Sequence, residues 1–213
     1  MSDRFSGVVL ASASPRRREL LEQIGVRYEI ADHTVDEDAL AGEPPMTLVQ
    51  RLALEKALSV VGSHSPQSTA RHQPWPVLGA DTIVVCDDHI LGKPLDKADA
   101  LRMWRLLSGR EHRVYSAVAL CDSQRREVRM STTTVTFRQL SDQDCERYWA
   151  SGEPQGKAGG YAIQGLGALF VSSVTGSYTG VVGLPLYETA ELLAIFGVCT
   201  GLSSAADGVH VNE

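Results

Sequence analysis

The chain has 213 residues, with a hydrophobic content of 43% and a charged content of 22%, values typical of a folded globular protein and not of a disordered one. Its net charge of −6 argues against a surface that as a whole attracts nucleic acid, and favours a small ligand in a local basic pocket. With no long apolar run and no signal peptide, the sequence predicts a cytoplasmic protein without a membrane segment.

The first third of the chain predicts short strands that alternate with helices. Residues 8–11 form a short apolar run and lead into a helix in which Ser14 is the cap and Pro15 the first residue. This helix should end at Gly25, and the alternating residues 26–32 predict a second strand.

The next segment predicts a second helix and a loop. Thr47 and Gln50 have the spacing of a capping box, which predicts a helix up to about residue 61. The polar residues 63–74 read as a mobile loop.

The remaining elements follow in the same way. Residues 77–86 predict a central strand, and a turn and a short return strand precede a helix capped by Asp96. Two long alternating runs, 112–120 and 127–137, predict a hairpin. Later expectations are a helix opened by Ser141 and Asp144, a glycine-rich stretch at 156–178, a helix from Pro185 to about Phe196, and a frayed tail at 199–213.

Strands that both alternate with helices and pair in a hairpin predict an α/β fold with a mixed central sheet flanked by helices. No linker interrupts the chain, so residues 1–213 are expected to form a single domain. The four cysteines are widely spaced, and neither they nor the histidines have the spacing of a zinc site, which favours reduced thiols in a cytosol.

Three arginines in a row, Arg16, Arg17 and Arg18, lie where the first helix should begin. A helix N-terminus already carries partial positive charge, so each arginine there costs about 0.3–1 kcal/mol unless an anion compensates it. Charge runs are usually solvated. A buried strand that leads into a capped turn is, however, the geometry with which α/β folds hold phosphate, so an anion site is the alternative to an exposed cluster.

Asp81 lies inside the apolar stretch GADTIVVC, where an unpaired carboxylate would be costly. It should therefore be paired, bound to a metal ion, or hydrogen-bonded to a turn at the strand end. Lys93, in the GKP that follows, could approach it, whereas Lys56 taken alone reads as a surface lysine.

Two further segments carry candidate ligands. Residues 35–38 (VDED) crowd carboxylates that could hold a divalent cation or simply form an acidic surface loop. In AGGYAIQGLG, residues 158–167, the glycines either turn a strand or let the backbone approach a ligand, without the spacing of a dinucleotide fold. Gln164 there is suited to reading the edge of a base.

Together these segments resemble the Maf proteins, nucleoside triphosphate pyrophosphatases of the inosine-triphosphatase-like fold. The resemblance covers about residues 8–198 and rests on LASASPRRRELL, RLALEK, GADTIVV, LGKP, LSGREHRVYSAVAL, EPQGKAGGYAIQGLG and GSYTGVVGLPLYET. It implies two lobes with a cleft between them, a divalent cation (Mg²⁺ or Mn²⁺), and cleavage of a triphosphate to a monophosphate and pyrophosphate. It also suggests a homodimer.

The resemblance assigns roles to individual residues. Asp81 matches the catalytic carboxylate, which would orient or deprotonate the attacking water, and Glu37 matches an acidic position that would hold the metal ion together with Asp81. The positions that face phosphate in the family correspond to Ser12, Arg16, Arg17, Lys56 and Lys93.

Three further matches concern the base. Arg16, Thr82 and Gln164 agree with the family members that act on thymidine and uridine triphosphates, and Thr82 and Gln164 would read the base. The other type, which prefers a methylated guanine nucleotide, shows S-P-W-R-R, S-D-Q and S-E-G instead. The sequence thus predicts a house-cleaning dTTP/UTP pyrophosphatase. The alternatives are a pyrophosphatase of another base preference, such as 7-methyl-GTP, and a non-catalytic nucleotide-binding regulator of septum formation.

Overall fold

The structure is a computed structural model that describes residues 5–62 and 75–202, so the loop predicted at 63–74 and most of the predicted tail lie outside the described residues. Its strands are β1 (Val8–Leu10), β2 (Tyr28–Ile30), β3 (Val77–Cys86), β4 (His89–Leu91), β5 (Glu111–Cys121), β6 (Arg126–Phe137) and β7 (Val171–Thr175). Its α-helices are α1 (Pro15–Gln23), α2 (Pro45–Leu58), α3 (Lys97–Leu107), α4 (Asp142–Ala150), α5 (Tyr178–Val182) and α6 (Leu186–Phe196). Two short 3₁₀ segments, η1 (Ala158–Gly160) and η2 (Leu166–Phe170), occupy the glycine-rich stretch.

The strands form one seven-stranded mixed sheet in the order β2-β1-β3-β5-β6-β7, with β4 also paired to β3. β1 is parallel to both β2 and β3, whereas the pairs β3–β5, β5–β6 and β6–β7 are antiparallel. This confirms the predicted mixed sheet and the hairpin of β5 and β6.

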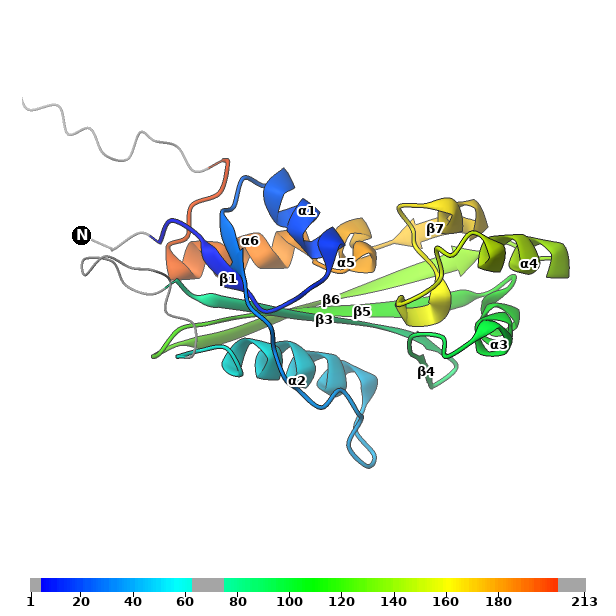
Figure 1. Ribbon diagram of the computed structural model, residues 1–213, viewed down its shortest axis with the longest axis horizontal. Coiled ribbons are helices and arrows are strands. Elements are labelled where there is room, and N and C mark those ends of the chain that lie inside the picture. The colour runs from blue at the N-terminus through cyan, green and yellow to red at the C-terminus, as the bar shows by residue number, and fades with distance from the viewer. Residues whose placement is uncertain (1–4, 63–74, 203–213) are drawn as a thin grey trace, which may run out of the picture.

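Helices cover both faces of this sheet (Figure 1). α2 lies against one face, and α1, α5 and α6 lie on the other; α3 and α4 gather at the far end of the long strands. Each face has its own hydrophobic cluster, one containing Leu52 and Ala57 of α2 and the other containing Leu192 and Phe196 of α6. The division into two lobes stays a prediction. No helix of the described segments combines the length and apolar character needed to cross a membrane.

The edge of β3 is left open in its middle. β1 pairs only with Val77 and Leu78, and β4 pairs only from Val84 onward. Between these two pairings, the segment 79–83 has no strand beside it on that edge. The gap contains Asp81, so the sheet itself leaves room for a cavity at the predicted catalytic carboxylate.

α2 packs unusually close to β3 at this gap. A Cβ on Gly79 would collide with the carbonyl oxygen of Ala53 and the backbone nitrogen of Ala57, so only glycine permits the approach. The next turn of the same helix face carries Lys56, which is 3% exposed. α2 therefore places the buried Lys56 next to Asp81 on the sheet.

Among the side-chain caps predicted for the helices, those at Asp96 and Ser141 are confirmed and the one at Thr47 is corrected. Asp96 accepts a hydrogen bond from Asp99 N (2.8 Å), and Ser141 and Asp144 form a reciprocal capping box. The capping box predicted at Thr47 and Gln50 was wrong. α2 begins at Pro45 instead, because a proline at the first helical position has its φ preset and lacks an N–H group that would need a cap.

His112 on β5 is buried in an aromatic cluster. Its Nε2 lies 2.8 Å from the hydroxyl oxygen of Tyr161, its ring packs edge-to-face on Phe137, and its Nδ1 has no hydrogen-bond partner among the described residues. Burial lowers the pKa of His112 to about 4. The folded protein thus keeps this imidazole neutral where the unfolded chain protonates it.

This burial predicts a loss of stability in acid. Because the pKa is depressed in the folded state, the unfolded state binds more protons as the pH falls from about 6.5 to about 4, and we expect a loss of about 3 kcal/mol in the free energy of unfolding. Urea unfolding at several pH values measures it. His112→Phe should remove this component; the same acid sensitivity in that variant would contradict the assignment.

Candidate functional site

A cavity of about 750 Å³ opens at the gap in the edge of β3. Because successive residues of a strand point to opposite faces, Asp81 and Thr82 line it from opposite sides of the sheet. The walls also come from α1, from α2, from the segment after β4, from the loop before η1 and from the end of α5. Among the predicted site residues, those in the lining are Ser12, Arg16, Arg17, Glu37, Lys56, Asp81, Thr82 and Lys93.

Lys56 joins two carboxylates in this cavity. Its Nζ donates to Asp81 Oδ1 at 2.7 Å and lies 2.5 Å from Glu37 Oε1. Both Lys56 and Asp81 are buried, whereas Glu37 is half-exposed. The simplest reading of Lys56 as a surface lysine was therefore wrong, and the buried carboxylate of Asp81 has the partner that its position requires.

Lys93 meets Glu37 and not Asp81. Its Nζ lies 3.6 Å from Glu37 Oε2, and its side chain is 64% exposed. Burial raises the pKa of Glu37, but the hydrogen bond from Lys56 and the charges of Lys56 and Lys93 outweigh burial and hold that pKa below its ordinary value. Glu37 is consequently ionised at neutral pH and can serve as an oxygen ligand.

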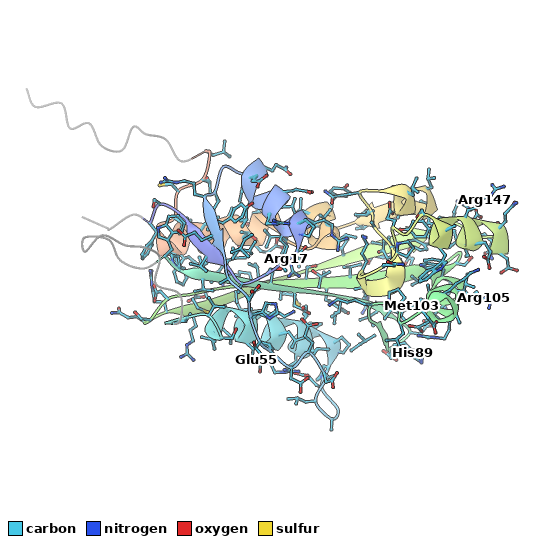
Figure 2. The ribbon with its side chains drawn as sticks, in the orientation of Figure 1. Arg17, Glu55, His89, Met103, Arg105 and Arg147 are labelled. Carbon is cyan, nitrogen blue, oxygen red and sulfur yellow. The ribbon has the colours of Figure 1, made fainter. Side chains whose placement is uncertain are left out.

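Arg17 reaches from the first turn of α1 toward the long strands (Figure 2). Its Nε donates to the carbonyl oxygen of Gly183 (2.8 Å) and its Nη1 to Ser12 Oγ (2.9 Å). Burial lowers the pKa of Arg17, an effect that the charge of Asp81 opposes, but a guanidinium stays protonated in proteins. Because both acceptors are neutral, the positive charge remains available to an anion.

The first turn of α1 adds donors to this charge. Ser14 is the N-cap residue, as predicted, but its side chain makes no capping hydrogen bond. The N–H groups at the start of the helix thus keep their capacity to bind an anion beside Arg17.

A second pair of cations lines another wall. Burial lowers the pKa of Arg16, and nearby Glu19, Tyr148 and Glu153 oppose the shift. Burial likewise lowers the pKa of Lys157, and the charge of Arg16 lowers it further. Lys157 had not been recognised in the sequence, because a single lysine in a glycine-rich loop carries no periodic signal.

Gln164 is placed differently from the other predicted residues. It is exposed and does not contribute to the lining of the cavity. The turn that carries it is fastened by Glu153, which accepts hydrogen bonds from Leu166 N and Gly167 N (both 2.9 Å) and from Tyr148 Oη (2.7 Å). Its role in reading the base stays a prediction.

Thr82 is half-buried and lines the cavity, and it contacts a residue that sequence reasoning missed. Its Oγ1 lies 3.0 Å from Oγ of Ser116, which is on β5 directly opposite Thr82 in the strand register. The signal that could have found Ser116 is a serine within the otherwise apolar run of its strand.

The carboxylates are compatible with a divalent cation. Among the described residues no group of three or more histidine, cysteine, aspartate or glutamate side chains is arranged to hold a metal ion. Mg²⁺ in phosphate-processing sites, however, is commonly held by one or two carboxylates together with substrate phosphates and water. Glu37 and Asp81, which converge on one ammonium group, provide such a pair.

Comparison with known proteins places the chain in a family. The family model described as Maf-like protein matches residues 7–196. A dTTP/UTP pyrophosphatase of Alkalilimnicola ehrlichii is 52% identical over 191 residues, covering 90% of this chain and 93% of the relative. Proteins of the same name from Saccharophagus degradans and Shewanella denitrificans are 48% and 50% identical, covering 92% and 87% of this chain and 91% and 94% of theirs. The chain belongs to the Maf-like protein family.

Proposed function

We propose that this protein hydrolyses dTTP and UTP to the nucleoside monophosphate and pyrophosphate. The observation that carries the proposal is the buried Asp81 with Lys56 and Glu37, open to a cavity that is also lined by Arg17. The printed names of the relatives at about half identity support the same reaction and the same bases.

Asp81 acts on the attacking water. Its Oδ1 accepts a hydrogen bond from Lys56, which fixes the carboxylate and leaves Oδ2 as the atom that receives the proton. The water oxygen then bonds to the α-phosphorus, the bond from that phosphorus to the bridging oxygen breaks, and pyrophosphate leaves with the electron pair. Metal titration of Asp81 variants tests the second role that we propose for this carboxylate, as a ligand of the metal ion.

The basic side chains bind the triphosphate. Arg16 and Arg17 of the first turn of α1 line the cavity together with Lys93 and Lys157. In the absence of a ligand these cations repel one another, so an anion with several charged oxygens relieves that repulsion as it binds. Ser12 holds Arg17 in place.

Mg²⁺ or Mn²⁺ is the cofactor we propose, held by Glu37 and Asp81. Such an ion, when bound, neutralises charge that develops on the phosphate oxygens. Lys56 would then release Glu37 and keep its hydrogen bond to Asp81 Oδ1, which its flexible side chain permits.

The base preference is the sharpest part of the proposal. Thr82 and Gln164 are the residues we assign to it, and a pocket fitted to one pyrimidine ring excludes a purine by size. We expect dTTP and UTP to be cleaved at least about tenfold better than GTP or ATP. Pyrophosphate release from a panel of normal and modified triphosphates, including 7-methyl-GTP, with Mg²⁺, Mn²⁺ and a chelator, measures this.

The double variant Thr82→Gln with Gln164→Glu carries the residues of the other family type. It should lower the preference for pyrimidine over purine triphosphates more than it lowers the rate with the best substrate. Equal cleavage of GTP and dTTP by the native protein would refute the assignment of Thr82 and Gln164 to the base. A native protein that binds nucleotides and releases no pyrophosphate would instead be the non-catalytic regulator.

We further infer a cytoplasmic location and a homodimer. The location is supported by the free thiols of Cys86, Cys121, Cys145 and Cys199, which suit a reducing compartment. The dimer rests on family resemblance alone, and size-exclusion chromatography with light scattering tests it.

A further inference from the structure

The cavity differs in character on the two sides of β3. On the side of Asp81 it is charged, with Lys56 and Glu37. On the side of Thr82, which α1 and α5 cover, the lining combines Arg17 with an apolar wall from Val84, Val114, Tyr161, Val181 and Val182. An apolar wall suits the flat ring of a base. The hydroxyl group of Tyr161 is engaged by His112, so Thr82 is the hydroxyl group that this wall offers for recognition of the base.

The hydrogen-bonding role of Thr82 is determined by its neighbours. Ser116 Oγ lies 2.5 Å from the carbonyl oxygen of Gly180, which can only accept, so Ser116 donates its single proton there. That carbonyl is free for Ser116 because Leu184 N, its partner in a regular α-helix, donates to Thr179 O instead (3.0 Å). Ser116 is 1% exposed, so it has no access to solvent as an alternative.

Thr82 must then be the donor to Ser116. The two hydroxyl oxygens are 3.0 Å apart, and Ser116 has already used its proton. Thr82 therefore gives its own proton to Ser116 Oγ, and toward the cavity it presents lone pairs only. This is an acceptor fixed by a buried chain of hydrogen bonds.

Such an acceptor selects between the pyrimidines according to the base atom that it faces: at N3 it favours uracil and thymine, and at position 4 it would favour the amino group of cytosine. Uracil and thymine carry a hydrogen at N3, whereas N3 of cytosine carries a lone pair. Building on the proposed function, we propose that Ser116 is a positioning residue that fixes the Thr82 hydroxyl as an acceptor and so selects bases with N3–H over cytosine. Ser116 itself does not line the cavity, so it would act through Thr82.

The test compares kcat/KM for UTP and CTP, which are equal in size, in the native protein and in Ser116→Ala. Without Ser116, the Thr82 hydroxyl can rotate and donate to N3 of cytosine, so the UTP/CTP ratio should fall about tenfold, the equivalent of one neutral hydrogen bond. A change in fold alone would lower both rates and leave the ratio in place. An unchanged ratio in folded Ser116→Ala, or a native preference for CTP, overturns the proposal.

Ser131→Ala is the matched control. Ser131 lies opposite Ser116 in the register of β5 and β6, is equally buried within a few per cent, and its Oγ has no hydrogen-bond partner among the described residues. The substitution Ser131→Ala removes a buried hydroxyl group that lies beside the hydrogen-bonded Thr82, Ser116 and Gly180 but makes no hydrogen bond with them. The UTP/CTP ratio should therefore stay that of the native protein. A fall as large as that in Ser116→Ala would mean that packing, and not the relay, sets the ratio.

A second measurement needs no variant and decides the matter if Ser116→Ala fails to fold. The fluorine of 5-fluorouridine triphosphate makes its N3–H ionise at lower pH than that of UTP. Once N3 has lost its proton, the base is an anion that the acceptor at Thr82 repels. The ratio of kcat/KM for 5-fluorouridine triphosphate to that for UTP should therefore fall as the pH rises, and a constant ratio overturns the proposal. Absence of pyrophosphate release from UTP and dTTP would instead refute the proposed function itself.

Discussion

Asp81→Asn is expected to lower kcat for dTTP and UTP by a factor of about 10² to 10⁴, the usual contribution of a general base. The amide keeps the shape of the side chain and can still accept from Lys56, but it does not take a proton from water. Affinity for the nucleotide should change little if proton transfer is its main role. Steady-state kinetics and calorimetry with a non-hydrolysable triphosphate analogue separate the two quantities.

The control for this substitution is Asp142→Asn. Asp142 is on α4, its side chain is 85% exposed, and its partner Arg105 lies far from Arg17 (Figure 2). Its loss should leave kcat unchanged. Near-normal turnover in Asp81→Asn would remove Asp81 from the mechanism, and loss of nucleotide binding together with kcat would point to a role in holding the metal ion.

Lys56→Met is expected to lower the free energy of unfolding by about 3–5 kcal/mol, because it leaves the buried carboxylate of Asp81 without its partner. Methionine fills much the same space, so the cost comes mainly from the unpaired charge. Urea unfolding followed by circular dichroism measures the change. Activity should also be lost, since Lys56 orients Asp81 and contacts Glu37.

The double variant Lys56→Met with Asp81→Asn separates charge from packing. Removing both charges should restore part of the stability lost in Lys56→Met, so the two substitutions are expected to be non-additive. Lys97→Met is the matched surface case: Lys97 pairs with Glu146 at 2.6 Å, both side chains are about half-exposed, and the expected cost is within about 1 kcal/mol. A double variant less stable than Lys56→Met would contradict the buried-charge explanation.

Much of the fold was determined by local sequence patterns. The apolar run around Asp81, the alternation in β5 and β6, and the caps at Asp96 and Ser141 act over a few residues, and each predicted its element closely. The capping pattern at Thr47 failed for an equally local reason, the prolines that precede it.

The family resemblance identified most of the candidate site, because its motifs mark individual positions in this sequence. Residue chemistry by itself indicated that Asp81 needed a partner and that the arginines called for an anion. It left open which cation would pair with Asp81. Lys93 was the expected neighbour of Asp81, but in the structure Lys56 pairs with Asp81 and Lys93 pairs with Glu37.

The tertiary structure decided what depends on contacts between distant segments. Lys56 reaches Asp81 because Gly79 lets α2 approach β3, and Ser116 reaches Thr82 because β3 and β5 are paired in one particular register. The exposed position of Gln164 likewise follows from how Glu153 holds its turn. Local periodicity determines which face of an element is buried, whereas the pairing of side chains across elements is set by packing distance and strand register, which no single segment encodes.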